Sequence, residues 1–583
     1  MVNYIVENTV GKLIEGKTPK EIAKMRFADI SCGSGSFLIT VFDKVLEYHR
    51  KWYQDNTEQA KKDGCILHEG KWVLSLKQKQ NILLNNIYGV DLDPQAIEVT
   101  QLSLYLKLLE DETTATANET WVMFKEQILP GLNNNIVCGN SLIGTDILDL
   151  TLFKGAVDEL KLRPMNFEDV FPDVFKKGSS TGSEQGFDAI VGNPPYRMIQ
   201  PHNTHENLLK YIKEKYEAAS FKIDLFHLFL NKGLRLTKNE GYLSYIIPTT
   251  ILNNVYAENL RKWILDNTRI KSIVTSKERI FPDADVYTTV FVFQKSDNGN
   301  IENNIMTSFE LQNLRTEQIL KYNIVNQSNF YKTSGFIWNI LLGESNFKLI
   351  QKMEQESVPL EDIAFINRGL ITGDRNKYFS NNKITEQYIE ILAGADVFRY
   401  YSNQPNEYVL FKRPKTSGGC WDKEVHLAEH KIIIRQIGFE PTASLILDPI
   451  AVTGNIFTIR HKLKDKDVEK LLLAIINSSL IEFYWKIMFA DFKNSFPQVT
   501  IESIAKIPIK GVNQTTNNKY FENPIVKLVD QMLEAKKQVA AAKTASEKEY
   551  LEKKCSIIDR QIDALVYELY GLTEEEIKIV EGN

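Results

Sequence analysis

Short, continuously apolar runs alternate with amphipathic stretches along the first half of the chain. The apolar runs have the length of buried strands, and the stretches between them have helical periodicity. Strands that alternate with helices indicate an α/β domain with a mostly parallel sheet. The segments predicted as strands are 25–31, 86–93, 135–142, 187–193, 241–252, 271–276 and 288–294, and the main helices between them are 36–52, 94–109 and 224–236.

The second half follows a different pattern. After about residue 296 the chain is polar and rich in asparagine, which suits a domain boundary or an excursion at a sheet edge. Short strand-like runs with turn signals from about residue 346 to 511 indicate a second, α+β domain. The last segment is helical, and it has a heptad seam. That seam packs either within the chain or against a partner or second copy, and it consists of Leu551, Cys555, Ile558, Ile562, Leu565 and Leu569.

One motif near the start of the chain matches a phosphate-binding pattern. The run from Gly11 to Thr18 has the form G-x-x-x-x-G-K-[ST]. A phosphate-binding loop needs a buried strand before it, whereas only ten residues precede Gly11 and they favour a helix. Thr18, Pro19 and Glu21 have instead the spacing of a capping box with proline at the first helical position. The motif therefore predicts a helix start and no phosphate site.

Composition narrows the class of protein. A length of 583 residues suits three or four domains. A hydrophobic fraction of 43% excludes a disordered chain. The five cysteines form no C-x-x-C pair and the eight histidines no H-E-x-x-H motif, so neither a disulfide framework nor a metal site is predicted. No apolar run approaches the roughly 18 residues of a membrane helix, and no signal-peptide pattern is present. We therefore expect a cytoplasmic protein without a membrane segment.

A glycine turn and an acid have the form of a ligand-binding edge. The sequence DISCGSGS at 29–36 joins a predicted strand to a predicted helix. Glycines let the backbone approach a ligand closely, and the N–H groups that begin the helix face that ligand. Asp91 ends the next predicted strand, where a carboxylate can bind ribose hydroxyls. Asp93 precedes Pro94, so we assign it to capping the following helix.

The strongest chemical signal is Asn193-Pro194-Pro195-Tyr196, directly after an apolar strand. Two prolines fix a rigid extended turn and leave a carbonyl with no competing local donor. The side-chain oxygen of Asn193 and the carbonyl of Pro194 can both accept hydrogen bonds from one planar –NH2 group, which exposes the nitrogen lone pair. Tyr196 offers a ring face for stacking on a flat base. The segment therefore predicts a site for a planar amine.

The order of these motifs resembles that of the gamma class of S-adenosylmethionine-dependent N6-adenine DNA methyltransferases. More narrowly, the chain is similar to the methylase-plus-specificity portion of Type IIG restriction–modification enzymes. The segments YGVDLDPQAIEVTQLSLYL, FDAIVGNPPY and GYLSYIIPTTIL carry the resemblance, which covers nearly the whole chain. It implies a Rossmann-like methyltransferase sheet over residues 1–310, an α+β target-recognition domain over 346–511 and a coiled-coil-like helical tail over 521–583.

The resemblance also implies roles for single residues. The cofactor would be S-adenosyl-L-methionine. Its methionine end would contact Asp29, Cys32, Gly33 and Gly35. Its ribose would bind to Asp91. Its adenine ring would pack on Leu92, and its adenine amine would contact Asn140. An aspartate usually stands where this chain has Asn140, whose oxygen can still accept a hydrogen bond. The target amine would be held by Asn193 and Pro194, in the rigid turn that Pro195 completes, and the target base would stack between Tyr196 and Phe281.

The implied reaction transfers a methyl group to the N6 amine of an adenine flipped out of duplex DNA, within a restriction–modification system. Cytosine C5 methylation is excluded because no Pro-Cys nucleophile motif is present. One alternative is an NPPY enzyme that acts on RNA or on a glutamine side chain. Another is a DNA-recognition fragment with impaired catalysis, since relatives carry a cofactor-contacting segment before the first helix. No nuclease motif is found, so we expect cleavage to require a domain or subunit encoded upstream.

Clusters of basic residues predict how DNA would be bound. The net charge of −5 gives the chain no bulk attraction for a polyanion. Double-stranded DNA as a partner therefore requires basic side chains on a local surface, which we expect at the cleft between the two large domains. Such side chains position DNA by its phosphates. The candidates, with interleaved aromatic residues, are Arg375, Lys377, Lys412, Arg413, Lys415, Lys431 and Arg435, and Tyr400, Tyr401, Phe411 and Trp421.

Overall fold

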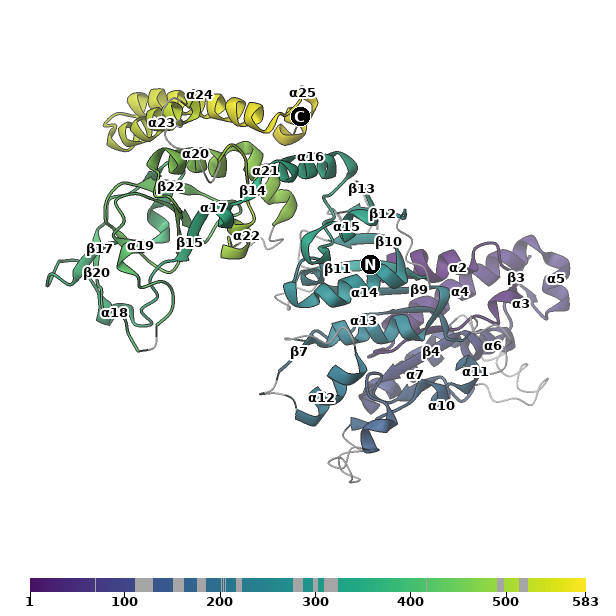
Figure 1. Cartoon of the computed structure of the whole chain (residues 1–583). Helices are drawn as coiled ribbons and strands as arrows, with labels where there is room; N and C mark the ends of the chain where they lie inside the picture. The colour runs from purple at the N-terminus through teal and green to yellow at the C-terminus, as the bar shows by residue number, and fades with distance from the viewer. Residues whose placement is uncertain are drawn as a thin grey trace. The chain divides into compact units, whose positions relative to one another are not determined.

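The computed structural model divides the chain into two compact units, Met1–Gly343 and Glu344–Asn583 (Figure 1). They are called unit 1 and unit 2 below, and each is described by itself. The structure describes residues 1–68, 70–110, 129–149, 162–175, 185–200, 202, 204, 206–216, 223–275, 287–296, 302–308, 323–415, 417–489, 498–512 and 523–582.

Unit 1 is built on a nine-stranded, mostly parallel sheet. In their order across the sheet, the strands are β13 Asn323–Asn326, β12 Asn304–Ser308, β10 Thr268–Thr275, β11 Thr288–Lys295, β9 Thr237–Pro248, β6 Phe187–Gly192, β1 Phe27–Asp29, β4 Ile87–Asp91 and β5 Ile136–Cys138. β1 pairs in parallel with β4 and β6, whereas β11 runs antiparallel to β9 and β10. The α/β fold and the strand segments predicted from hydrophobicity are confirmed.

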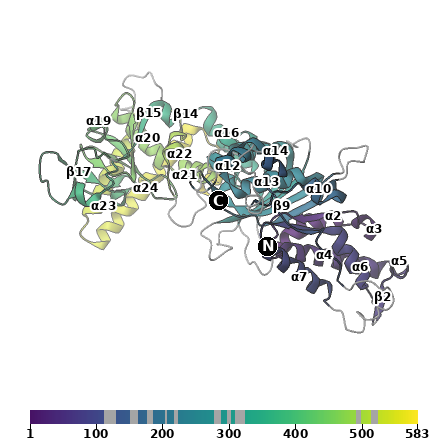
Figure 2. The same cartoon turned by 90° about the horizontal axis from the view of Figure 1, so that it is seen from below.

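Amphipathic helices pack against this sheet (Figure 2). The main ones are α4 Ser36–Asp55, α6 Leu76–Asn86, α7 Pro94–Leu108, α13 Leu225–Leu236 and α14 Glu258–Asn267. α4 buries apolar positions three and four residues apart, and these join Phe27 and Ile87 of the strands in one core. Because parallel strands end at the same edge, the residues that follow β1, β4, β5 and β6 meet there.

The N-terminal segment is helical, as predicted. α1 (Val2–Val6) continues through a π-helical turn at Glu7–Gly11 into α2 (Lys12–Ile14). Gly11 therefore lies inside a helix and does not follow a strand. At the start of α3 (Pro19–Ile22), the Thr18 N–H donates to the Glu21 carboxylate at 2.8 Å and the Glu21 N–H donates to the Thr18 hydroxyl at 3.4 Å. The predicted capping box is confirmed.

Unit 2 combines two small sheets with helices. The first sheet has the order β15 Ala364–Arg368, β24 Ile456–His461, β21 Lys431–Arg435 and β22 Ala443–Ile446. The second has the order β16 Phe379–Ser380, β20 Glu407–Leu410, β17 Tyr388–Leu392 and β23 Ala451–Val452. The helices α20 (Lys466–Asn477) and α21 (Ser479–Met488) follow in the chain, and α20 packs on β22. The expected α+β composition is confirmed.

Three helices end the chain: α23 Pro524–Ala541, α24 Ala545–Tyr570 and α25 Glu574–Glu581. α24 packs along α23, and α23 packs on α20. Gly571, with a φ of 68°, ends α24, and a capping box formed by Thr573 and Glu576 begins α25, as predicted. The structure divides the chain after Gly343. The functional domain limits expected at residues 310, 346, 511 and 521 stay a prediction.

The heptad seam of α24 packs within unit 2. Its first four members are buried, and the last two, Leu565 and Leu569, are half-buried. Tyr550 and Ile557 lie outside the seam and are exposed, at 69% and 51%. Packing inside the chain therefore accounts for the seam, and a dimer through the C-terminal helices stays a prediction.

Among the residues that the structure describes, no single helix has the length and apolar composition needed to cross a bilayer. The helices α20 and α21 reach that length and composition only jointly, across a 59° bend. The same residues contain no group of three or more His, Cys, Asp or Glu side chains arranged to hold a metal ion.

Replacing Ile562 by alanine should destabilise unit 2. Ile562 is fully buried in the seam, so the substitution should lower the free energy of unfolding by about 2–4 kcal/mol. Ile557→Ala on the exposed side of the same helix is the matched control and should change it by less than about 0.5 kcal/mol. Urea unfolding followed by circular dichroism measures both. Equal effects would contradict packing within the chain.

Candidate active site

The glycine turn after β1 is hydrogen-bonded to the residues that follow β4. The Gly33 N–H donates to Asp91 Oδ2 at 2.8 Å, and the Thr100 hydroxyl donates to the Gly33 carbonyl at 2.7 Å. Gly33 and Gly35 have φ values of 53° and 83°, which residues with a side chain rarely adopt. A Cβ on Gly35 would lie 2.8 Å from a carbon of Thr100, whereas one on Gly33 would meet no described atom within 4 Å. Gly33 therefore leaves its side of the turn open to a ligand.

Asp29 and Cys32 are buried next to this turn, with exposures of 1% and 5%. The Asp29 carboxylate accepts a hydrogen bond from the Ser31 N–H at 2.9 Å. A Cβ on Gly192, at the end of β6, would lie 2.6 Å from Asp29 Oδ1, so glycine there makes room for the carboxylate. Cys32 belongs to the apolar core of unit 1. A ligand at this turn would therefore meet mainly its backbone.

Burial makes Asp29 a titrating group near neutral pH. Removal from water raises the pKa of Asp29 to about 7; the hydrogen bond from Ser31 opposes this rise, and the charge of Asp91 adds to it. Asp29 therefore changes its charge over the physiological pH range.

Asp93 caps the helix after β4, as predicted, and Asp91 does not. Asp93 Oδ1 accepts from the Gln95 N–H at 3.0 Å and caps α7. Asp91 Oδ1 accepts from the Asp93 N–H at 2.9 Å, in addition to the bond between its Oδ2 and Gly33. These two backbone bonds fix the Asp91 carboxylate, and each oxygen keeps a further lone pair.

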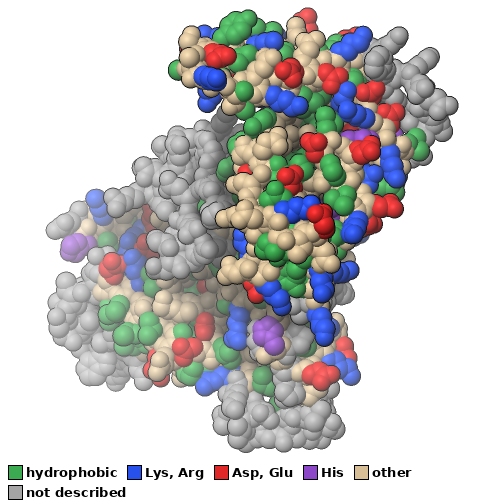
Figure 3. Space-filling model, turned by 90° about the vertical axis from the view of Figure 1, so that its left-hand side faces the viewer, with side chains coloured by type: hydrophobic (Ala, Val, Ile, Leu, Met, Phe, Trp, Pro, Cys, Tyr) green, Lys and Arg blue, Asp and Glu red, His purple; other side chains and the backbone are tan. Residues whose placement is uncertain are grey.

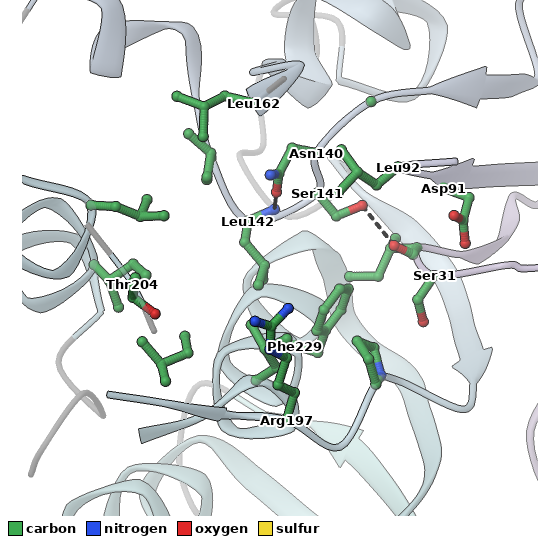
Figure 4. A pocket seen from close by; sticks show the side chains of 18 of the residues that line it. Ser31, Asp91, Leu92, Asn140, Ser141, Leu142, Leu162, Arg197, Thr204 and Phe229 are labelled. Carbon is green, nitrogen blue, oxygen red and sulfur yellow. Dashed lines mark hydrogen bonds between the residues drawn. The ribbon is translucent and has the colours of Figure 1, made fainter. Parts of the chain in front are cut away.

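The loop after β5 is joined to the end of β1. The Ser141 hydroxyl donates to the Ile30 carbonyl at 2.6 Å, and Asn140 Oδ1 accepts from the Leu142 N–H at 3.0 Å (Figure 4). The Asn140 N–H donates to the Arg163 carbonyl at 2.8 Å. Asn140 is thereby held in a defined orientation beside Leu92.

The turn after β6 is held against β9 by Tyr196. The Tyr196 hydroxyl lies 2.6 Å from Asn193 Oδ1 and 2.8 Å from the Ile246 carbonyl, and it can donate to either. Its ring meets Phe226 edge-on, with centroids 6.3 Å apart and an interplanar angle of 85°. Burial, reinforced by the charge of Asp224, raises the pKa of Tyr196, so the hydroxyl stays a neutral donor. The arrangement fixes the Asn193 carboxamide, which is exposed.

These loops line one pocket of about 610 Å³ at the edge of the sheet (Figure 4). It brings together five of the predicted site residues, namely Asp91, Leu92, Asn140, Asn193 and Pro195. Asp29, Cys32, Gly33, Gly35, Pro194 and Tyr196 do not line it. Gly33 and Tyr196 are hydrogen-bonded to Asp91 and Asn193, and Pro194 lies between Asn193 and Pro195. Phe281 lies outside the described residues.

The pocket has a further wall that the sequence motifs did not reveal. Leu225 and Phe229 of α13, with Leu208 and Ile212 of α12 (Glu206–Lys215), supply apolar surface, and Arg197 supplies the pocket's one described cation. No sequence pattern separates Phe229 from the other apolar residues of its helix. The position of Arg197 directly after the NPPY turn was a signal that sequence reasoning left unused.

The basic residues predicted in unit 2 are only in part available to a partner. Lys412, Arg413 and Lys415 are exposed directly after β20, whereas Arg375 is paired with Glu407. The expectation for Lys431 is wrong: it is fully buried, its Nζ donates to the His426 carbonyl at 2.8 Å, and burial lowers its pKa to about 8. On the face drawn in Figure 3, Lys and Arg side chains are interspersed with Asp and Glu.

The expectation that Tyr400 lies at a DNA-binding surface is also wrong, because its side chain is 1% exposed in unit 2. Tyr401, Phe411 and Trp421 are half-buried, and the last two rings pack together at 5.8 Å. The spacing of these residues in the sequence did not distinguish the buried and half-buried positions from exposed ones.

Two family models match the chain in separate regions. Residues 85–281 match the Eco57I restriction-modification methylase, and residues 389–509 match the TaqI-like C-terminal specificity domain. This chain joins an Eco57I-like methylase domain to a TaqI-like specificity domain. The first match contains Asp91, Asn140 and the NPPY turn, and the second contains most of both sheets of unit 2. The resemblance to restriction–modification methylases seen in the motifs is thereby confirmed.

Two curated relatives are named as Type II enzymes. The Type II restriction enzyme and methyltransferase RM.Eco57I of Escherichia coli is 28% identical over 446 residues, which are 71% of this chain and 41% of that protein. The Type II methyltransferase M.AccI of Acinetobacter calcoaceticus is 28% identical over 223 residues, 35% of this chain and 39% of that protein. The chain thus spans less than half the length of either relative.

A solved structure shares the fold across both domains. The Type IIL restriction–modification enzyme MmeI in complex with DNA aligns with a TM-score of 0.58 and 10% identity, over 98% of this chain and 73% of that one. At this identity the likeness shows a common fold for the methylase and specificity domains.

The titration of Asp29 should be visible in the stability of the chain. Because its folded pKa of about 7 lies above the value of 3.8 for an unburied aspartate, the folded state holds the proton more tightly between these values. The free energy of unfolding should therefore fall as pH rises from about 4 to 7 and level off above. Asp29→Asn should lack this component. Urea unfolding of both proteins at pH 5 and pH 8 measures the difference, and parallel pH profiles would contradict it.

Proposed function

We propose that this chain is an adenine-specific DNA methyltransferase. It transfers a methyl group from S-adenosyl-L-methionine to the N6 amine of an adenine flipped out of duplex DNA. The observation that carries the proposal is the single pocket in which Asn193 and Pro195 lie with Asp91, Leu92 and Asn140. The methylase match and the names of the Type II relatives support the methyltransferase class.

One side of the pocket has the donor and acceptor groups that suit the cofactor. Asp91 keeps lone pairs free for the two ribose hydroxyls after its backbone bonds are made. Leu92 is 47% exposed, and an apolar side chain there suits the face of an adenine ring. Asn140 keeps one lone pair beside its bond to Leu142 for the adenine amine. When bound, S-adenosyl-L-methionine supplies a methyl group already activated by its sulfonium.

The other side of the pocket presents acceptors for the target amine. Tyr196 fixes the Asn193 carboxamide, and its second lone pair stays available for an N–H of the substrate. The Pro194 carbonyl is the second acceptor in our proposal. Two acceptors on one amine orient its lone pair toward the methyl group, which is a positioning effect. The methylated nitrogen then loses its proton to solvent, so no general base is required.

Access to the amine requires the adenine to leave the DNA stack. Flipping costs roughly a few kcal/mol, which stacking in the pocket offsets in part. We assign one stacking face to Tyr196 and the other to Phe281. Phosphate contacts from exposed residues such as Lys412, Arg413 and Lys415 would position the duplex, and the specificity domain would read its bases.

The direct test is methyl transfer by the full chain. Incubation with S-adenosyl-L-methionine labelled at the methyl group should place label in unmethylated plasmid DNA. RNA and total protein, offered under the same conditions, should stay unlabelled. Label in RNA or protein alone would show a different NPPY methyltransferase, and no label in any acceptor would contradict the proposed activity.

Asn193→Ala should abolish methyl transfer while the cofactor still binds. The substitution removes the acceptor for the target amine but leaves Asp91, Leu92 and Asn140 unchanged. Transfer should fall by about a hundredfold or more, since positioning of the amine is lost. Titration calorimetry with S-adenosyl-L-methionine should give the wild-type Kd. Near-wild-type transfer by this variant would refute the role of Asn193.

Tyr196→Phe should separate stacking from hydrogen bonding. The phenylalanine ring keeps the stacking face but no longer fixes Asn193 Oδ1, so kcat should fall about tenfold, the worth of roughly one hydrogen bond. KM for DNA should stay unchanged. Tyr196→Ala, which also removes the ring, should raise KM as well. Wild-type kcat in Tyr196→Phe would contradict the positioning role of the hydroxyl, and equal kcat and KM in the two variants would contradict stacking by the ring.

A further inference from the structure

Arg197 is a charged side chain in the pocket for which the methyl-transfer chemistry has no use. It directly follows the NPPY turn, it is exposed, and it lines the pocket. Figure 4 shows its guanidinium directed into the pocket beside Phe229. Within the described part of the chain, the guanidinium makes no hydrogen bond and no ion pair.

The backbone at Arg197 is held from both sides although its side chain is not. The Arg197 carbonyl accepts from the Leu225 N–H at 2.9 Å, at the start of α13. On the other side, Tyr196 is anchored to the Ile246 carbonyl at 2.8 Å. The position from which the guanidinium extends is therefore fixed, and none of its five N–H donors has a partner among the described residues.

A guanidinium with free donors at the mouth of a pocket is suited to an oxyanion. Arginine binds phosphate and carboxylate groups through two parallel hydrogen bonds, which gives direction as well as charge. Among the described residues that line the pocket, the charged ones are Arg197 and Asp91. Asp91 accepts hydrogen bonds from the Gly33 and Asp93 N–H groups, and no ion pair joins it to Arg197 in the described part of the chain.

Under the proposed function, two anionic groups would lie in this region: the carboxylate of the cofactor and a phosphodiester of the DNA. The position of Arg197 in the pocket indicates which of them it binds. The cofactor carboxylate belongs to the methionine end, which we assign to the glycine turn, and neither Gly33 nor Gly35 lines the pocket with Arg197. The phosphodiester of the flipped nucleotide must instead lie within one nucleotide of the base held by Asn193. Arg197 follows that turn in the chain and is exposed to solvent, from which DNA approaches.

We propose that Arg197 binds a phosphodiester flanking the flipped adenine and so holds the nucleotide in the pocket. This inference rests on the proposed function and adds a residue to its DNA contacts. Arg197 is then a positioning residue for the extruded nucleotide. It supplies a phosphate contact from unit 1 itself, in addition to those proposed for unit 2.

The first test compares Arg197→Ala and Arg197→Lys with the wild-type full chain. On plasmid DNA, Arg197→Ala should lower kcat/KM for DNA about ten- to a hundredfold, the effect of one charge-assisted contact. Arg197→Lys should recover part of this loss because it keeps the charge. The plot of log binding constant against log salt should lose about one unit of slope in Arg197→Ala. The Kd for S-adenosyl-L-methionine should not change in either variant.

Lys20→Ala is the matched control, because Lys20 is an exposed cation on α3, which Figure 1 draws apart from β7 (Met198–Ile199) in unit 1. It should leave kcat/KM and the salt slope unchanged. A wild-type salt slope in Arg197→Ala, or a changed cofactor Kd without a change in DNA binding, would overturn the proposal.

The second test removes the phosphate charge instead of the arginine. A duplex with the sequence that the wild-type protein methylates is made with one neutral methylphosphonate on either side of the target adenine. At one of these positions the wild type should lose about tenfold in kcat/KM, whereas Arg197→Ala should lose nothing further. Equal losses in both proteins at both positions would refute the contact. Absence of methylation by the wild type on any DNA would instead refute the proposed function.

Discussion

The parallel pairing of β1 with β4 on one side and with β6 on the other brings together the glycine turn, Asp91 and the NPPY turn of unit 1. It brings the ends of the three strands to one edge, in the register Asp29 to Gly89 and Ala28 to Ile190. The glycine turn, Asp91 and the NPPY turn follow these strands directly. Their hydrogen bonds, from Gly33 to Asp91 and from Tyr196 to Ile246, then fix groups that are far apart in the sequence. The first of these bonds crosses between the ends of β1 and β4, and the second joins the turn after β6 to β9.

Glycine 192 shows how closely this edge is packed. It is the last residue of β6, and a side chain there would overlap the Asp29 carboxylate. The same residue precedes Asn193, so one position serves both the buried acid of β1 and the NPPY turn. The ends of β1 and β6 are therefore packed closely against each other.

The parts of this account that depend on local patterns could be predicted from sequence. Hydrophobic runs located the strands, and capping chemistry distinguished Thr18 and Asp93 from ligand-binding residues. The motifs that follow the strands singled out Asp91 and Asn193, whereas Asn140 was singled out by the family resemblance alone. Features that arise from packing could not be predicted. The burial of Lys431 and Tyr400, the bond from Tyr196 to Asn193 and the wall formed by Phe229 depend on which side chains face each other across separate elements. Sequence spacing carries no information about such pairs.

The central claim is that the pocket methylates an exocyclic amine of adenine, and the identity of the product tests it most directly. Unmethylated plasmid DNA, incubated with the full chain and S-adenosyl-L-methionine, is digested to nucleosides and analysed by mass spectrometry against the untreated DNA. The account predicts N6-methyldeoxyadenosine, formed by the wild type and not by Asn193→Ala. A methyl group found only on cytosine, or no methylated nucleoside at all, would contradict it.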